Sequence, residues 1–209
     1  MNVLLRTLLV VAAATLALDA QSQPRIPAGD TLRWPTGTFS ILAYDPASGD
    51  LGGAVQSRVF SVGNGVLWAE SAVGIVAKGN FYSHTGPKAS AWAGGKYCAP
   101  PHKCTAQGNI LAGQGVVDSM VAAFERTPGP LHLRLVAALE GGQRAGGDTH
   151  GQQSAAMIIV NVKKNCGVWL HNDVILRLQV DDNPEPIREL RRLAEHRAAQ
   201  RRDSTCRAR

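Results

Sequence analysis

Apolar and polar positions first form a regular pattern at Thr38. Residues 38–44 are rich in β-branched and aromatic side chains, residues 45–50 have the composition of a turn, and residues 51–56 resume the strand pattern. This pattern predicts a β-hairpin with a six-residue loop. We therefore expect the folded domain to begin at Thr38.

Two helices are predicted after residue 115. Apolar residues recur on one helical face at Val116, Val117, Met120, Val121 and Phe124, and residues 127–130 end this pattern with two prolines and a glycine. A second helix is expected over residues 130–140, with Gly141 and Gly142 as its stop.

Further strands and a last helix complete the pattern. Residues 73–77 and 155–162 are continuous apolar runs, residues 174–180 alternate, and Asn183 is expected to cap a helix whose first residue is Pro184. The predicted elements follow the order of two strands, then helices, then strands and then a helix. A doubly wound sheet instead alternates strands with helices. The order indicates an α+β fold in which helices cover antiparallel sheets.

The N-terminus has the pattern of a secretory signal. Arg6 precedes an apolar run over residues 8–17, and Ala20 offers a small residue for cleavage. The alternative, an uncleaved anchor, needs an apolar run of about 20 residues. We expect a signal peptide over 1–20, a linker or propeptide over 21–37, and a periplasmic or secreted protein without stable membrane insertion.

The net charge of +6 does not indicate nucleic-acid binding. Eight arginines and only three acidic residues lie between Arg188 and the C-terminus, so most of the excess belongs to the end of the chain. No aromatic residues are interleaved with these arginines, as stacking on bases would require. We expect a domain over 38–195, a basic tail over 196–209 and no nucleic-acid partner.

Cys98 and Cys104 enclose a short segment that contains His102. A disulfide, two free thiols and a metal site are the alternatives. An exported chain meets an oxidising compartment, which favours the disulfide, and the spacing differs from that of common zinc sites. Motifs for phosphate, dinucleotide or zinc-hydrolase chemistry are absent from the sequence, so neither a metal nor a cofactor is expected.

Polar residues gather at the ends of predicted strands and in glycine-rich segments, at residues 56–58, 107–109, 146–148 and 152–154. Polar groups at strand ends line binding sites in many folds. They also serve as hydrogen-bonding groups in turns and caps, and the pattern alone leaves both interpretations open.

Several of these segments resemble a bacterial family known as domain of unknown function 1028. The similar blocks run in the same order from Thr38 to about Leu193 and include residues 38–46, 49–52, 54–58, 92–94, 107–113, 146–148, 153–156 and 180–184. That family is grouped with the N-terminal-nucleophile (Ntn) hydrolase superfamily. The resemblance therefore implies a four-layer αββα sandwich with two antiparallel sheets between helix layers.

The resemblance also implies a chemistry for Thr38. In Ntn hydrolases the first residue of the mature chain attacks an amide carbonyl, and its free α-amine, with an ordinary pKa of about 7.7–8.0, takes the proton. The Gly37–Thr38 junction is similar to one at which related threonine hydrolases cut themselves. Removal of a signal peptide leaves residues 21–37 attached, so further processing is needed. The alternative is that Thr38 only begins a strand.

The same resemblance suggests roles for other residues. Asn109, or backbone amides of a turn at Gln107 and its neighbours, would stabilise the oxyanion. Ser57 and Arg58, at the end of the neighbouring strand, would orient Thr38. Asp148 would hold an ammonium group or a cationic substrate.

One segment departs from the family pattern. Family members carry a helix and at least one further strand where this chain has only residues 78–84. Their loss would expose an apolar face and a sheet edge, which a homodimer would cover. Lys78 is either an activating lysine or a solvent-facing loop residue.

These observations favour an exported Ntn-type amidohydrolase acting on an amide or peptide-like substrate. The alternative is an envelope binding or structural module that keeps the fold and has lost the chemistry, or an inactive truncated product. The sequence does not distinguish a peptide from another amide.

Overall fold

The computed structural model describes residues 37–65, 92–161 and 174–200, and in them six strands form one antiparallel sheet. The strands are β1 (Thr38–Asp45), β2 (Asp50–Ser57), β3 (Ala93–Tyr97), β4 (Lys103–Asn109), β5 (Ser154–Val160) and β6 (Val174–Val180). Their order across the sheet is β3-β4-β1-β2-β5-β6. The helices of these residues are α1 (Val62–Gly65), α2 (Gln114–Arg126), α3 (Leu131–Arg144) and α4 (Pro186–Gln200). The expected α+β class is thereby confirmed at this level.

The β1–β2 hairpin confirms the first prediction with a shorter loop. Asp45 pairs with Asp50, so the loop has four residues rather than six. The Asp45 carboxylate accepts hydrogen bonds from the Ala47 backbone N–H and the Ser48 hydroxyl, at 3.0 and 3.1 Å. Gly49, with φ of 74°, closes the turn by donating to the Asp45 carbonyl. With these hydrogen bonds in the turn, β1 continues to Asp45 and β2 begins at Asp50.

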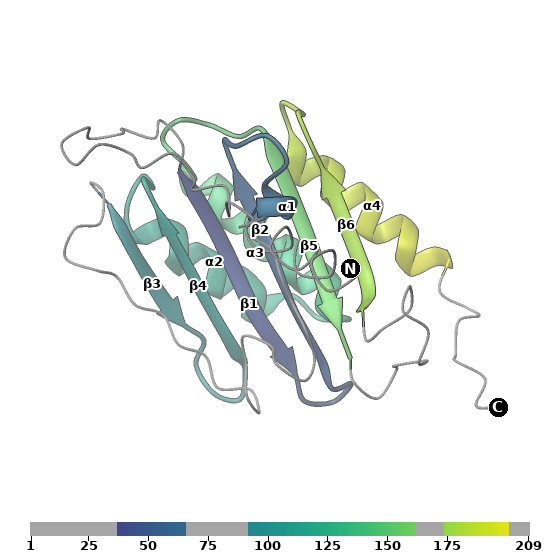
Figure 1. Cartoon of the computed structure of the whole chain (residues 1–209). Coiled ribbons are helices and arrows are strands. Elements are labelled where there is room, and N and C mark those ends of the chain that lie inside the picture. The colour runs from purple at the N-terminus through teal and green to yellow at the C-terminus, as the bar shows by residue number, and fades with distance from the viewer. Residues whose placement is uncertain (1–36, 66–91, 162–173, 201–209) are drawn as a thin grey trace, which may run out of the picture. The chain divides into compact units, whose positions relative to one another are not determined.

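Helices α2, α3 and α4 lie on one side of the sheet, and β1 runs through its centre (Figure 1). Phe39, Ile41 and Ala43 alternate along β1 and are fully buried in the core that includes α2 and α3. Side chains of a strand alternate between faces, so Thr38 and Ser40 point to the opposite face. Burial of each large apolar side chain stabilises the fold by about 1.5–3 kcal/mol.

Helix α3 continues through Gly141 and Gly142, where a stop was expected, and that prediction was wrong. A Cβ atom at Gly141 would lie 2.6 Å from the Ser119 carbonyl oxygen, and one at Gly142 would lie 2.7 Å from Cγ of Met120. Both glycines therefore allow α3 to approach α2 closely. Ala145, with its N–H on the Gly141 and Gly142 carbonyls, follows the helix end.

The β3–β4 pair was not predicted from the sequence. Gln107, Gly108 and Asn109, expected in a turn, lie in β4 instead, paired with both β1 and β3. Cys98 and Cys104 join the two strands as a disulfide, which settles the alternatives left open by the sequence. The Cys98 N–H also donates to the Cys104 carbonyl at 3.0 Å.

The C-terminal elements agree closely with the sequence. Strand β6 has the predicted bounds, whereas α4 begins at Pro186 rather than Pro184 and continues to Gln200, beyond the expected domain boundary. The side-chain oxygen of Asn183 accepts a hydrogen bond from the Glu185 N–H. Arg191 joins α4 to α3 through two bonds to Glu140, and these bonds raise the pKa of the Arg191 guanidinium.

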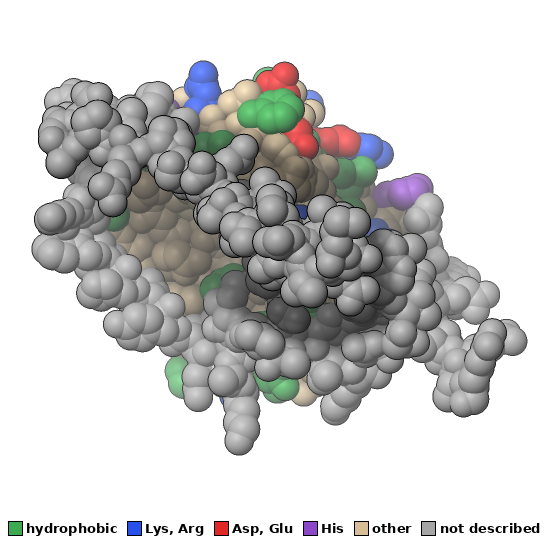
Figure 2. All heavy atoms as spheres, viewed as in Figure 1, with side chains coloured by type: hydrophobic (Ala, Val, Ile, Leu, Met, Phe, Trp, Pro, Cys, Tyr) green, Lys and Arg blue, Asp and Glu red, His purple; other side chains and the backbone are tan. Residues whose placement is uncertain are grey.

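The face of the sheet opposite α2 and α3 carries a second, smaller apolar cluster. Its members are Val55, Val62, Ala156, Ile158 and Val160, with Leu51 packed beside them. In Figure 2 the described atoms visible on this face are mainly backbone and uncharged polar atoms, with charged side chains towards one edge. The sheet thus has apolar residues on both faces.

Several predictions fall outside the described residues: the signal peptide, the linker up to residue 36, the strand over 73–77, Lys78, and the chain beyond residue 200. Among the helices that are described, none has the length and apolar character needed to cross a membrane.

Candidate functional site

Polar side chains from three strands meet where β1 begins. Thr38 pairs directly with Ser57 at the end of β2 and with Asn109 at the end of β4. Directly paired residues of adjacent strands share a face, so the three side chains lie side by side, opposite the Phe39 face. Ser154 extends this row, because it pairs with Ser57 from β5.

Ser57 connects the Thr38 side chain to the preceding carbonyl group. Its hydroxyl donates to the Gly37 carbonyl oxygen at 2.9 Å, and its oxygen lies 2.9 Å from the Thr38 hydroxyl oxygen. A hydroxyl has one hydrogen to donate, so Thr38 must donate to Ser57. The N–H of Val59 also donates to Ser57 Oγ at 3.2 Å, and the Ser57 side chain is fully buried. The position of the Ser57 hydroxyl is thus fixed on all sides.

Asn109 holds the other end of the same peptide unit. Its side-chain oxygen accepts a hydrogen bond from the Thr38 backbone N–H at 3.1 Å. The Gly37–Thr38 peptide is therefore held by side chains at both its carbonyl oxygen and its N–H. In this arrangement the donor to the carbonyl is Ser57, and the expected oxyanion role of Asn109 stays a prediction for a processed chain.

A glycine turn brings Asp148 to this cluster. Gly146 and Gly147 have φ angles of 109° and 52°, which glycine adopts without strain. The turn pairs with the segment after β4: Ala112 donates to the Gly147 carbonyl, and Leu111 forms a bridge with Asp148. As a result the Asp148 carboxylate lies against Gly37.

The Asp148 carboxylate is buried, with 4% of the residue exposed. Its Oδ1 atom accepts a hydrogen bond from the His150 N–H at 2.8 Å and lies 3.5 Å from Nδ1 of His150. Its Oδ2 atom is buried and accepts no hydrogen bond from the described residues. Sequence reasoning did not select His150, whose only signal is its place two residues after Asp148.

Two other predicted site residues border the cluster, and their side chains donate to groups other than Thr38. Arg58 donates to the His150 carbonyl and so joins β2 to the Asp148 segment. Gln107 donates to the Ser40 hydroxyl at 2.6 Å, one row further along the sheet. The structure thus brings Thr38, Ser57 and Asn109 into contact, with Asp148 beside them and Arg58 and Gln107 at the border.

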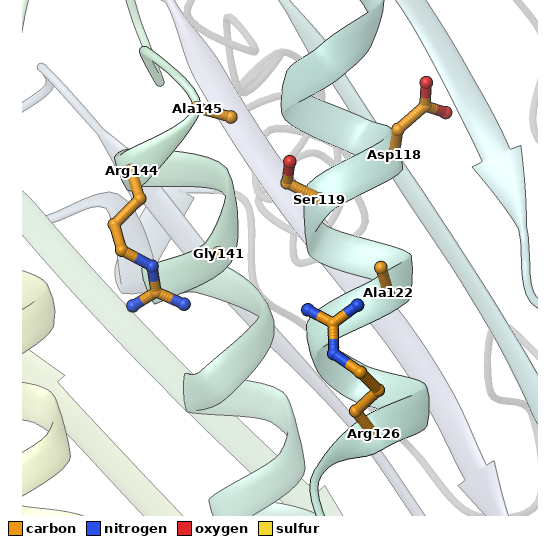
Figure 3. Close-up of a pocket in the computed structure, with 7 residues that line it drawn as sticks. All are labelled: Asp118, Ser119, Ala122, Arg126, Gly141, Arg144 and Ala145. Atoms are coloured by element: carbon orange, nitrogen blue, oxygen red, sulfur yellow. The ribbon is translucent and has the colours of Figure 1, made fainter.

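A separate groove of about 390 Å³ lies between α2 and α3 (Figure 3). It is lined by Asp118, Ser119, Ala122, Arg126, Gly141, Arg144 and Ala145. None of the predicted site residues lines it. Within the described part of the chain, no group of three His, Cys, Asp or Glu residues has an arrangement suited to a metal ion. The predicted residues Thr38, Ser57, Asn109 and Asp148 come together at the start of β1 instead, and this Thr38 cluster is the candidate site.

The sequence model of DUF1028, a family of unknown function, matches residues 38–82 and 75–190. This chain belongs to the DUF1028 family. A crystal structure of a DUF1028 protein from Silicibacter pomeroyi is similar in fold, with 23% identity, a TM-score of 0.63, and coverage of 77% of this chain and 88% of that one. No curated protein matches the chain.

The DUF1028 blocks noted in the sequence converge on the Thr38 cluster. The block at residues 107–113 supplies Asn109 and the segment that pairs with Asp148. The block at residues 153–156 forms the start of β5 beside β2. The two matched segments overlap at residues 75–82, near the place where a helix and a strand are expected to be lost. That overlap lies outside the described residues.

Proposed function

We propose that this chain is an exported amidohydrolase of the Ntn type, with Thr38 as the nucleophile and an amide or peptide-like substrate. The observation that carries the proposal is the pair of hydrogen bonds of Ser57, one to the Gly37 carbonyl oxygen and one to the Thr38 hydroxyl. A hydroxyl nucleophile, a carbonyl and a donor on that carbonyl are the parts that acyl transfer needs.

Processing comes first in this proposal. Thr38 Oγ1 attacks the Gly37 carbonyl carbon, its proton passes to the Thr38 nitrogen, and the Gly37–Thr38 amide becomes an ester. Water then cleaves the ester, giving a Gly37 carboxylate and a free Thr38 amine. Ser57 donates to the oxygen on which negative charge develops, and Asn109 holds the nitrogen that becomes the leaving group.

Substrate hydrolysis repeats the same bond changes. The free α-amine of Thr38 takes the hydroxyl proton, Oγ1 attacks the substrate carbonyl, and the substrate amine leaves with that proton. Water then releases the acyl group from Thr38. Ser57 again donates to the oxyanion, with the side-chain NH2 group of Asn109 as the expected second donor, and the amide oxygen of Asn109 orients the α-amine. No metal or cofactor takes part in these steps.

Two further features of the chain support the wider proposal. The apolar cluster of Val55, Ala156 and Ile158 on the second face of the sheet suits the buried inner face of a four-layer αββα sandwich. The disulfide between Cys98 and Cys104 suits an oxidising compartment, as the signal pattern at the N-terminus requires. The proposed location is the periplasm or the extracellular medium.

The test is the mass and N-terminal sequence of the protein exported from cells. We expect a mature chain that starts at Thr38, and a Thr38→Ala variant that keeps residues 21–37. The Thr38→Ser variant retains a hydroxyl and should still be processed. A wild-type chain that starts at Gln21 and stays so during incubation would refute the catalytic proposal in favour of a binding module.

A further inference from the structure

The space around Gly37 is too small for any side chain. An ideal Cβ atom on this residue would lie 2.7 Å from Cγ and Oδ1 of Asp148 and 2.8 Å from the backbone oxygen of Asn109. Real Cβ atoms essentially never approach other atoms to under 3.0 Å. Gly37 is not among the residues with positive φ, so the space and not the backbone conformation requires glycine here.

The walls of this space are rigid. The Asn109 oxygen belongs to the backbone of β4, which is paired on both sides by β1 and β3. Asp148 has a short, fully buried side chain, and its Oδ1 atom is held by the His150 N–H. A side chain at residue 37 would have to displace a central strand or a buried carboxylate, and neither movement is small.

The geometry points to a substrate whose acyl group has an unsubstituted methylene next to the scissile carbonyl, that is, a glycyl amide. This inference rests on the proposed function. The processing ester joins the Gly37 carbonyl to Thr38 Oγ1, and the acyl-enzyme formed from a substrate joins the substrate carbonyl to the same atom. With the carbonyl oxygen at Ser57 in both esters, the next carbon of the substrate acyl group takes the place of Gly37 Cα in the processing ester, close to its position in the precursor.

Asp148 forms one wall of this acyl site, and its buried Oδ2 atom accepts no hydrogen bond from the Gly37 N–H or from any other described group. The selection therefore comes from the small space beside the methylene. L-amino acids that carry a side chain on this carbon are excluded.

The substrate test uses the wild-type chain that begins at Thr38. Glycyl-p-nitroanilide and N-acetylglycyl-p-nitroanilide should be hydrolysed, with L-alanyl-p-nitroanilide slower on the order of 100-fold, as expected when one extra carbon does not fit. Equal rates on the glycyl and L-alanyl anilides overturn the inference and leave the nucleophile intact. Hydrolysis of neither anilide by a correctly processed chain also overturns this substrate class.

A precursor test keeps the two proposals distinguishable. Gly37→Ala should slow release of residues 21–37 on the order of 100-fold, whereas Gly115→Ala, at a site with no atom within 4 Å, should be processed as wild type. Processing of Gly37→Ala at the wild-type rate overturns the inference alone. Absence of processing in the wild type overturns the proposed function itself. The anilide comparison needs no variant, so a folding defect of Gly37→Ala does not affect it.

Discussion

The Ser57 hydroxyl donates a 2.9 Å hydrogen bond to the carbonyl oxygen of Gly37, the residue before the proposed nucleophile. Backbone carbonyls beside a paired strand end are usually satisfied by other backbone groups. Here a buried side chain takes that place, and the same side chain receives the Thr38 hydroxyl. The arrangement makes Ser57 the residue most informative to change.

Ser57→Ala should slow cleavage at the Gly37–Thr38 bond by about 10²–10³-fold, because one donor to the developing oxyanion is lost. The intact mass of the precursor, followed over time, measures this rate. Ser154→Ala is the matched control: this serine is equally buried and pairs directly with Ser57, but its hydroxyl donates to the Val59 carbonyl rather than to Gly37. If both variants slow cleavage equally, Ser57 acts only through stability.

Asn109→Asp should change the pH dependence of the processed enzyme. A carboxylate beside the free α-amine of Thr38 favours the ammonium form and raises the pKa of that amine. The amine acts as a base only when unprotonated, so the rising limb of the pH–rate profile should move to higher pH. Gln107→Glu adds the same charge one row away and should move the profile less. A profile unchanged by Asn109→Asp contradicts the contact with the amine.

Gly141→Ala should lower the free energy of unfolding by about 1–3 kcal/mol, because a methyl group would press against the Ser119 carbonyl and Ala123 between two packed helices. Gly115→Ala lies in a helix with open space around it and should raise the free energy of unfolding by up to about 1 kcal/mol. Urea denaturation of both variants measures the difference. Equal midpoints would contradict close α2–α3 packing.

Reduction of the Cys98–Cys104 disulfide should lower the free energy of unfolding by about 2 kcal/mol, since the bond closes a short loop and constrains the unfolded chain. Denaturation with and without a phosphine reductant measures this. The Cys98→Ser, Cys104→Ser double variant should show the same loss and no response to reductant. A response of the double variant to reductant would assign the effect to other cysteines.

Asp118 gives the chain a small, predictable response to acid. The hydrogen bond from Lys96 lowers the pKa of this carboxyl, with help from Gln114. A lowered pKa in the folded state contributes stability above the ordinary pKa of about 3.9, and this is lost as pH falls through the folded value. The pair is exposed, so the contribution should be only about 0.2–1 kcal/mol.

Asp118→Asn should remove the contribution of this carboxyl to the pH dependence of the free energy of unfolding between neutral and acid pH. Lys96→Gln should remove the same part, and the double variant should lose no more than either alone. Additive losses would contradict the pairing.

The sequence predicts strands that have large apolar side chains, a clear neighbouring turn or a regular alternation, and it misses β3 and β4. Residues 38–44 are rich in β-branched and aromatic side chains, the turn at residues 45–50 locates β2 despite Gly52 and Gly53, and β6 alternates. These three strands were therefore found with nearly correct bounds. Strand β3 contains Gly94 and Gly95, and β4 has only small or polar side chains, so neither has a hydrophobic period. Pairing on both sides of β4 outweighs that weak local preference.

The contacts of the candidate site likewise divide into those that the sequence predicts and those that only the fold brings together. The β1–β2 hairpin places Ser57 opposite Thr38, and a hairpin is a local feature that residue order reveals. Asn109 and Asp148 reach Gly37 and Thr38 through pairings over 71 residues or more, which no local period specifies. The size of the space at Gly37 depends on these distant groups, so only the folded structure reveals it.

The central place of β1 has a consequence for the chain end that cleavage would create. All eight residues of β1 pair with β2, and seven of them also pair with β4. Residues at a new chain terminus usually fray, and their amide hydrogens exchange quickly because local opening there costs little free energy. A terminus at Thr38 would open only with the sheet itself, so its first amides should exchange as slowly as those of the core.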